Sequence, residues 1–430
     1  MDNISFLKVH SSNIELLRQK DTHAFSEGET PIFNSGSDLV SLGGELVNEP
    51  SKKWTILNYA AADNNLVSII DNVIDLESIG SDENINFLVQ LDIGRGDFPD
   101  KNVASGAKRY YLNQSDDLNQ ISSPVLQDLG KINMSDPNVL ADFVTWGIKN
   151  YPAENYMVFI SSHGKFWTGV IDDSSLGSRM SIPEMRNAFE KAEKETGESI
   201  DLICFDACYM ATVEVANELS EIADFMVASQ NVIHSAGFPY SLIFGDNEDD
   251  ATTKVDFNLS PRDAASKIVK VSSDSKSIRT LSAIDLSKID GLRNSVNQFA
   301  QTVIEGETEK SVLRDIALTL RTFNKDNTYK VIDLYNFACL IIESDLIKES
   351  ALKDAAQNIL DSVENTVFEN YSERDFEDAH GLSIEASPRK LNTNKYQALS
   401  FANASLWDDV LGESNIIFEV ANKVKTFLGV

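Results

Sequence analysis

Residues 156–164 of the chain read Tyr-Met-Val-Phe-Ile-Ser-Ser-His-Gly, and residues 200–208 read Ile-Asp-Leu-Ile-Cys-Phe-Asp-Ala-Cys. Each stretch begins with a short, nearly continuous apolar run, which is typical of a strand buried on both faces of a parallel sheet. Each then becomes polar, so that His163 and Cys208 follow directly after a strand. Because ligand sites of open α/β sheets lie outside the carboxyl ends of the strands, we expect both side chains at one edge of one sheet.

The same alternation of strands and helices extends to both sides of these two stretches. Further strands are predicted at 54–60, 85–91 and 224–229, and apolar residues at helical spacing predict helices at 65–79, 137–149, 182–195 and 212–219. Strands rich in Val, Ile, Leu and Phe that alternate with helices indicate an α/β fold, in which helices cover both faces of a mostly parallel sheet.

Three regions follow one another along the chain. Residues 1–50 are a lead-in segment without a readable pattern, and residues 51–250 hold the α/β core. Residues 251–430 are a more helical region, with helices expected at 261–271, 288–304 and 310–323 and strands at 280–284 and 381–384. These strands would allow the third region to extend the same sheet rather than fold separately.

The composition bounds the partners of the chain. It has 430 residues, 42% of them hydrophobic, and a formal net charge of −30. The charge excludes nucleic acid, which needs clustered Lys and Arg, and favours basic ligands unless it only maintains solubility. No run approaches the roughly 18 apolar residues of a membrane helix, and the first residues lack a secretory pattern. We therefore expect a cytoplasmic monomer away from membranes, with secretion as the alternative location.

The three cysteines, Cys204, Cys208 and Cys339, cannot form a disulfide framework and show no Cys-x-x-Cys spacing. A nucleophilic thiol needs a base nearby, and His163 arrives at the same sheet edge as Cys208. Gly164 lacks a Cβ, so its N–H and that of Cys208 are candidates for an oxyanion hole. Taken singly, a buried thiol or a structural histidine would be the better interpretation, but together these residues favour catalysis.

Three other polar residues compete for roles. His380 competes with His163 for the role of base, but it precedes its strand, so a parallel strand would put it at the far edge of the sheet. His234 follows a strand and is a candidate pocket wall, with the role of base as a minor alternative. Asp206 lies two residues before Cys208 and should share its face of the chain. It could bind a basic side chain of a substrate or cap a helix, and the residue type alone favours neither.

Other enzyme classes lack their motifs. Gly94-Arg-Gly96 follows a strand, but Pro99 stands where a dinucleotide loop needs its third glycine. A His-Glu-x-x-His helix, a phosphate-binding lysine loop and a Gly-x-Ser-x-Gly elbow are all absent from the sequence. The commonest metalloprotease, NTPase and serine hydrolase mechanisms are thereby excluded.

Ser-Ser-His163-Gly164 after a strand, followed by Asp206-Ala-Cys208-Tyr-Met-Ala211, resembles the clostripain-like cysteine peptidases of the caspase-like clan. The resemblance spans about Trp54 to Leu411. It implies a caspase-like fold and hydrolysis after Arg or Lys by a dyad of Cys208 and His163, with Asp206 as the specificity-setting acid. The rival interpretation is a caspase-like binding or scaffold module with a vestigial dyad.

The resemblance also extends to Val227-Ala-Ser-Gln230, and Ser229, Gln230 and Asn231 are expected to contribute to substrate binding. The family often has an acidic residue just after the pair Ala228-Ser229, where this sequence has Gln230 and Asn231. The second charge of the S1 pocket is therefore missing, and the specificity for basic residues could be weaker or broader. Peptidases of this kind are made as zymogens that cut themselves, and the polar segment before Arg179-Met180 is the expected site. Calcium is a further implied activator, for which the cluster Asp246 to Asp250 offers oxygen ligands, although a solvated acidic turn is the simpler interpretation. No other cofactor is expected.

Overall fold

The computed structural model describes residues 51–94, 96–245, 257–306, 308, 310–323, 329–387 and 393–410. All of them belong to one compact unit, Glu49–Val430. The lead-in segment 1–50 and the acidic cluster Asp246 to Asp250 lie outside the described residues.

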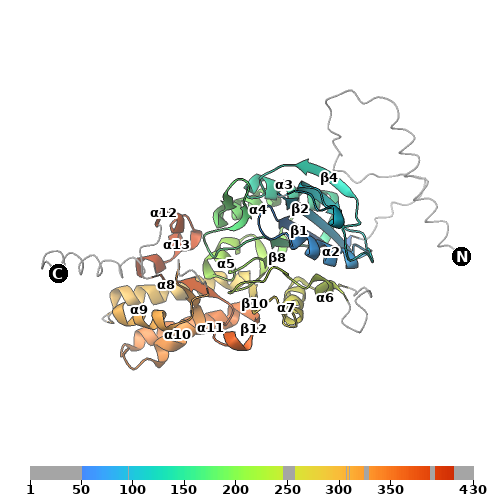
Figure 1. Cartoon of the computed structure of the whole chain (residues 1–430). Coiled ribbons are helices and arrows are strands. Elements are labelled where there is room, and N and C mark those ends of the chain that lie inside the picture. Colours follow the sequence, from blue (N-terminus) through green and yellow to red (C-terminus); the bar gives the residue numbers. More distant parts are fainter. Residues whose placement is uncertain are drawn as a thin grey trace, which may run out of the picture. The chain divides into compact units, whose positions relative to one another are not determined.

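A nine-stranded sheet forms the centre of this unit (Figure 1). From one edge to the other its strands are β12 (Val367–Ser372), β10 (Thr280–Asp285), β9 (Ala223–Ala228), β8 (Ile200–Asp206), β5 (Ala153–Ser161), β1 (Lys52–Ala61), β2 (Ile85–Ile93), β3 (Gly106–Tyr111) and β4 (Val125–Gly130). The five strands from β9 to β2 are parallel to one another. At each edge of the sheet two further strands are added, each antiparallel to the strand before it. The predicted α/β fold with a mostly parallel sheet is confirmed.

Alternate residues of β1 enter two separate hydrophobic cores, one on each face of the sheet. Leu57 and Tyr59 belong to the first core, and Ile56 and Ala60 to the second. The first core is covered by α3 (Pro137–Asn150), α4 (Ile182–Thr196), α5 (Val213–Leu219), α8 (Ile289–Glu305), α9 (Lys310–Thr319), α10 (Leu334–Glu343), α11 (Ser350–Thr366), α12 (Thr393–Tyr396) and α13 (Ser400–Ala404). The second is covered by α2 (Ile69–Ile79), α6 (Tyr240–Phe244) and α7 (Pro261–Ser272).

The helices that follow the central strands begin at residues suited to that position. Asp136 caps α3, and Ser181 caps α4 in a capping box with Glu184. A proline follows each cap within the first two helical positions, where its missing N–H costs nothing. These signals fix where each crossover helix starts and how its apolar side meets the sheet.

The C-terminal region contributes to two sheets. Of the two strands expected there, the one at 280–284 is β10, which pairs with β9 and carries β12 on its other side. The other is β13 (Ser383–Glu385), which instead pairs with β11 (Val331–Asp333) in a separate two-stranded sheet. Ser383 donates its N–H to the carbonyl of Ala211, so β13 lies beside the segment that follows the cysteine strand.

A small hairpin separates β5 from α4. It consists of β6 (Val170–Asp173) and β7 (Ser178–Met180), joined by an exposed turn over 174–177. Three short 3₁₀ segments complete the described elements: η1 (Pro99–Lys101), η2 (Leu286–Lys288) and η3 (Arg374–Phe376). Within the described residues, no helix combines the length and the apolar character needed to cross a bilayer.

Candidate active site

The register of β5 and β8 brings the predicted dyad together. Ser161 and Asp206 are Cα partners in this parallel pair, so His163 and Cys208 each stand two residues beyond matched positions. Neighbouring strands lie about 4.8 Å apart. Both residues line the same cavity, which has a volume of about 210 Å³.

Segments after four strands supply the walls of this cavity. The lining residues are Leu66, Ile69, Asn72, Ser162, His163, Asp206, Ala207, Cys208, Val232, Ile233, His234, Ser235 and Gly237. Apolar side chains therefore alternate with a carboxylate, a thiol and two imidazoles. His234 lies in the wall, as its position after β9 suggested.

His163 is held by an asparagine. Its Nε2 lies 2.7 Å from Oδ1 of Asn65, and because that oxygen can only accept, Nε2 carries the proton and Nδ1 is left as the basic nitrogen. Burial lowers the pKa of His163; Asp172 opposes this shift and Arg179 adds to it. The imidazole is therefore neutral at rest.

Cys208 is protonated at rest. Its Sγ donates to the carbonyl of Ile233 at 3.5 Å. Burial raises the pKa of the Cys208 thiol, the hydrogen bond to Ile233 lowers it, and the nearby carboxylate of Asp206 raises it. A neutral thiol can become a nucleophile only if a base takes its proton, and the neutral imidazole of His163 lines the same cavity.

Gly164 is a glycine because the turn of Cys208 approaches it closely. A Cβ at this position would lie 2.3 Å from the carbonyl oxygen of Cys208 and 2.8 Å from Sδ of Met210. Gly164 and Val170 form an isolated antiparallel bridge. The hydrogen bonds of this bridge belong to the neighbouring residues: the Ile171 N–H donates to the His163 carbonyl, and the Lys165 N–H donates to the Gly169 carbonyl. The N–H of Gly164 therefore takes no part in this ladder.

Asp206 points its carboxylate at the cavity and does not cap a helix. The cap of α5 is Thr212. Oδ2 of Asp206 accepts from Asn72 Nδ2 at 3.3 Å, from the Phe238 N–H at 3.3 Å and from the Tyr240 hydroxyl at 3.1 Å. No donor among the described residues reaches Oδ1. Burial raises the pKa of Asp206 to about 6, although the three hydrogen bonds oppose the shift.

Ser229, Gln230 and Asn231, by contrast, do not line the cavity. All three are buried, and Gln230 uses both ends of its amide: Nε2 donates to Asp333 and Ser383, and Oε1 accepts from the Gly381 N–H. Asn231 accepts the Tyr209 N–H through its carbonyl. These contacts hold the cysteine loop against β13, and the expected contribution of the three residues to substrate binding stays a prediction.

His380 also lies away from the cavity. Its Nδ1 is 3.1 Å from Oδ1 of Asp333, its own N–H donates to the other oxygen, and its ring stacks on Tyr335. His380 does not line the cavity of Cys208, whereas His163 and His234 do.

The segment around Arg179 and Met180 is more ordered than its composition suggested. Arg179 forms a two-pronged ion pair with Asp172 across the β6–β7 hairpin, with Nη2 at 2.6 Å from Oδ2, and Met180 is fully buried. Arg179 itself is exposed and follows the exposed turn over 174–177, and self-cleavage after it stays a prediction.

Sequence patterns alone missed three contacts of the site: Asn65 on His163, and Asn72 and Tyr240 on Asp206. Asn65 belongs to a polar run, Asp63-Asn-Asn, that follows β1 at the same sheet edge. That run was the available signal, since polar residues after a central strand belong to the site.

Comparisons with known proteins agree with this geometry. The model of the clostripain family matches residues 58–414. The chain belongs to the clostripain family. The clostripain-like resemblance is thus confirmed, and this clostripain-family chain is a cysteine peptidase whose substrates are peptides or proteins.

Individual relatives are distant but cover most of the chain. Clostripain of Hathewaya histolytica is 25% identical over 397 residues, which cover 78% of this chain and 74% of that protein. A secreted C11 cysteine protease from Bacteroides thetaiotaomicron, solved with an irreversible peptide inhibitor, is 21% identical with a TM-score of 0.60 and covers 83% of this chain and 99% of that one. An inactive zymogen C11 protease from Parabacteroides distasonis is 21% identical with a TM-score of 0.62, covering 82% and 98%. The two structures share the fold of this clostripain-family chain.

Proposed function

We propose that this clostripain-family chain is an endopeptidase that cleaves after Arg, and after Lys to a lesser degree, with Cys208 as nucleophile and His163 as acid/base. The observation that carries the proposal is that the thiol, the imidazole and a buried carboxylate line one cavity at the carboxyl ends of adjacent strands. Thiol, base and a counter-charge for a basic side chain are the groups that this reaction needs.

The steps follow from the protonation states. As the substrate binds, Nδ1 of His163 takes the proton of the Cys208 thiol, and the sulfur attacks the scissile carbonyl. The N–H groups of Gly164 and Cys208 stabilise the oxyanion. The protonated His163 then gives its proton to the leaving amine, the C–N bond breaks, and water hydrolyses the acyl-enzyme with His163 as base.

Asp206 is proposed to set the specificity. Its Oδ1 has no donor among the described residues, whereas Oδ2 is fixed by Asn72, Phe238 and Tyr240. A guanidinium bound at Oδ1 would find a rigid acceptor in a site of low polarity, where a charge-assisted hydrogen bond is strong. The family often has a second acidic residue in the S1 pocket, whereas this chain has only Asp206. We therefore expect a smaller difference in kcat/KM between basic and neutral P1 residues.

The deciding experiment varies only the P1 residue of a fluorogenic peptide. We expect kcat/KM to be highest for Arg, to vanish in Cys208→Ala and His163→Ala, and to fall about a hundredfold in Asp206→Asn for Arg but not for a neutral P1 residue. Asp100→Asn, which removes an exposed aspartate, is the matched control. Equal losses for Arg and neutral P1 peptides in Asp206→Asn would remove Asp206 from the specificity site.

Self-cleavage after Arg179 is proposed as the activating step. Arg179 follows the histidine strand and precedes the cysteine strand, and it would have to leave Asp172 before it could enter a cavity with an acidic wall. Intact-mass measurement should show two fragments in the wild type and a single chain in Cys208→Ala and Arg179→Ala. A cut at another residue in the wild type would move the site and leave the peptidase proposal intact.

If the chain is instead a binding or scaffold module, Cys208 should not react with a substrate-like probe. A thiol-reactive peptide with Arg at P1 should label Cys208 in the enzyme and nothing in a scaffold.

The solved relative from Bacteroides thetaiotaomicron is described as secreted, which favours the secreted location over the cytoplasmic one for this chain. The monomeric state expected from the sequence remains part of this proposal, and light scattering of the purified chain would test it.

A further inference from the structure

Two aromatic residues beside the dyad share a strained backbone conformation. Phe166 of the histidine loop (residues 162–169) has a φ of 53°, and Tyr209 of the cysteine loop (residues 207–212) has a φ of 66°. In this left-handed region a bulky side chain is crowded by its own backbone, so glycine or asparagine is usual there. Such strain persists only where the surrounding structure holds the residue in place. Each loop therefore needs a contact that offsets this cost.

The rings of these two residues stack on each other. Their centroids are 4.6 Å apart and their planes are inclined by 23°. Phe166 is 1% exposed, and Tyr209 is half-buried against the first core. Stacked aromatic rings contribute free energy beyond that of the area they bury. One contact between the two loops thus opposes the strain of both residues.

Main-chain hydrogen bonds fix the position of each ring. In the histidine loop the Lys165 N–H donates to the Gly169 carbonyl at 3.0 Å, which closes the turn that carries Phe166. In the cysteine loop the Tyr209 N–H donates to the Asn231 carbonyl, also at 3.0 Å. The stack therefore joins two turns that are already held by the main chain.

We propose that Phe166 and Tyr209 are positioning residues, which hold the histidine loop on the cysteine loop and so keep His163 within reach of the Cys208 thiol. The proposal rests on the proposed function of His163 and Cys208 as the catalytic dyad. The loops also approach each other at Gly164, where a Cβ would lie 2.3 Å from the Cys208 carbonyl oxygen, but glycine has no side chain that could hold them together. Neither ring lines the cavity, so their loss should change the geometry of the dyad and not the binding of substrate.

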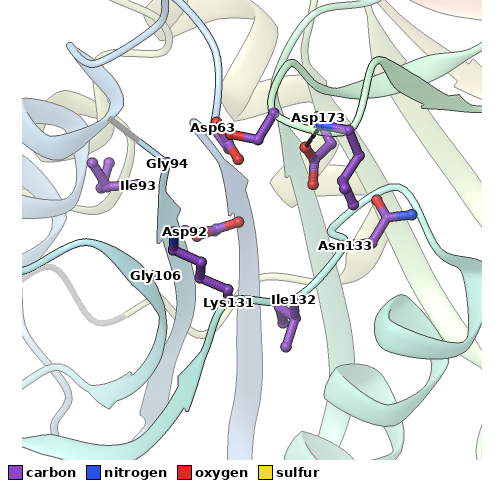
Figure 2. A pocket seen from close by; sticks show the side chains of 11 residues that line it. Asp63, Asp92, Ile93, Gly94, Gly106, Lys131, Ile132, Asn133 and Asp173 are labelled. Atoms are coloured by element: carbon purple, nitrogen blue, oxygen red, sulfur yellow. Dashed lines mark hydrogen bonds between the residues drawn. The ribbon is translucent and has the colours of Figure 1, made fainter. Parts of the chain in front are cut away.

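In the chain cut after Arg179, the two rings would belong to different fragments. The tip of the β6–β7 hairpin is held within the first fragment, because the Ser174 N–H donates to the carbonyl of Asp63 at 2.7 Å. Figure 2 shows Asp63 and Asp173 at that tip, with their carboxylates turned toward a second cavity, of about 220 Å³. That hydrogen bond does not connect the two fragments. The ring stack does, and we expect it to keep base and nucleophile aligned after the cut.

Replacements of Tyr209 in the full chain separate the role of the ring from that of the backbone. Tyr209→Gly removes the ring at a position where glycine adopts the same φ without strain, so the chain should fold. We expect its kcat for an Arg peptide to fall about 10- to 100-fold with little change in KM, because the loops lose their contact. Tyr209→Phe keeps the ring and should retain the wild-type kcat. Wild-type kcat in Tyr209→Gly would overturn the proposal, and so would an equal loss in Tyr209→Phe.

Tyr151→Ala is the matched control. Tyr151 stacks on Tyr111 with ring centroids 5.2 Å apart and planes inclined by 24°. It precedes β5, whereas His163 follows β5, so this pair lies at the opposite end of the strand. Its loss should lower the thermal midpoint and leave kcat unchanged. An equal fall of kcat in Tyr151→Ala would trace the effect to stability alone and sink the proposal.

A double-mutant cycle tests whether the two rings act on each other. Phe166→Ala and Tyr209→Gly each break the same contact, so the double variant should lose about as much kcat as the more impaired single variant. If the two losses multiply instead, the rings act separately and the proposal fails.

One readout needs no catalysis. In a Cys339→Ser background, iodoacetamide should alkylate Cys208 about tenfold faster at pH 7 in Tyr209→Gly than in the parent, because a released cysteine loop exposes the thiol to water. An unchanged rate would contradict the proposal. If the parent cleaves no peptide, the proposed function fails, and this rate alone decides whether the stack holds the loops.

Discussion

Ser161 of β5 and Asp206 of β8 are Cα partners in the parallel ladder between the two strands. These two residues end their strands, and His163 and Cys208 each follow two residues later in the chain. The relative position of the imidazole and the thiol is thus fixed by the register of two central strands that are buried along most of their length. A one-residue slip would move every side chain of one strand to the other face, so the register is strongly specified.

Replacing Gly164 should disrupt the turn of Cys208. In Gly164→Ala the new methyl group would meet the Cys208 carbonyl at 2.3 Å, so we expect a loss of about 1–3 kcal/mol in unfolding free energy and of nearly all activity. Gly291→Ala is the control: its Cβ meets nothing within 4 Å in α8, and it should stabilise by about 1 kcal/mol. Urea unfolding measures both changes. Equal stability of the two variants would contradict the close approach.

The reactivity of Cys208 should report a neutral thiol. Burial raises the pKa of Cys208 above that of an ordinary cysteine, so its alkylation by iodoacetamide should keep accelerating beyond pH 9. A Cys339→Ser background removes the other partly exposed thiol, while Cys204 is fully buried. A rate that reaches its plateau near pH 6 would instead reveal a thiolate paired with imidazolium.

Asn65 should act as a positioning residue for His163. Without the 2.7 Å contact at Nε2, the ring can turn, so we expect Asn65→Ala to lower kcat about 10- to 100-fold with little change in KM. Asn65→Asp should restore much of the rate and shift the acidic limb of the pH profile upward, because a carboxylate raises the pKa of His163. Asn119→Ala, at an exposed asparagine, should change nothing. A loss in Asn65→Ala without the shift in Asn65→Asp would indicate a structural role only.

Basic substrates should bind less well in acid than neutral ones. The pKa of Asp206 is about 6, so its carboxylate is charged above that pH and becomes neutral as the pH falls through it. KM for an Arg peptide should therefore rise below about pH 6, while KM for a neutral P1 peptide stays level. In Asp206→Asn the difference between the two peptides should disappear. Parallel profiles in the wild type would argue that another group carries the basic preference.

The sequence was sufficient for the parallel centre of the fold. Strands such as Tyr156–Ile160 are apolar on both faces, and capping residues such as Ser181 mark the helix starts, so local signals and the final structure agree. The edge strands and the small second sheet could not be predicted from the sequence. β4 (Val125–Gly130) is largely exposed and has little apolar alternation, and the pairing of β13 with β11 depends on a contact distant in sequence.

The residues of the site that lie next to the ends of central strands were the ones that could be predicted. His163, Cys208 and Asp206 follow central strands directly, so their shared edge could be inferred. Gln230 also follows a strand, yet its amide turns toward Asp333 and Ser383, a choice set by partners more than a hundred residues away in the chain.

The β6–β7 hairpin lies between two strands that are hydrogen-bonded neighbours. Breaking the peptide bond after Arg179 would remove one covalent link and none of the main-chain bonds that join β5 to β8. The two pieces would therefore remain a single particle in native buffer and separate only in denaturant, with one new terminus on either side of the cut. Such a nick would release one end of the β6–β7 hairpin beside the cavity that His163 and Cys208 line. The central sheet beneath the hairpin would stay in place.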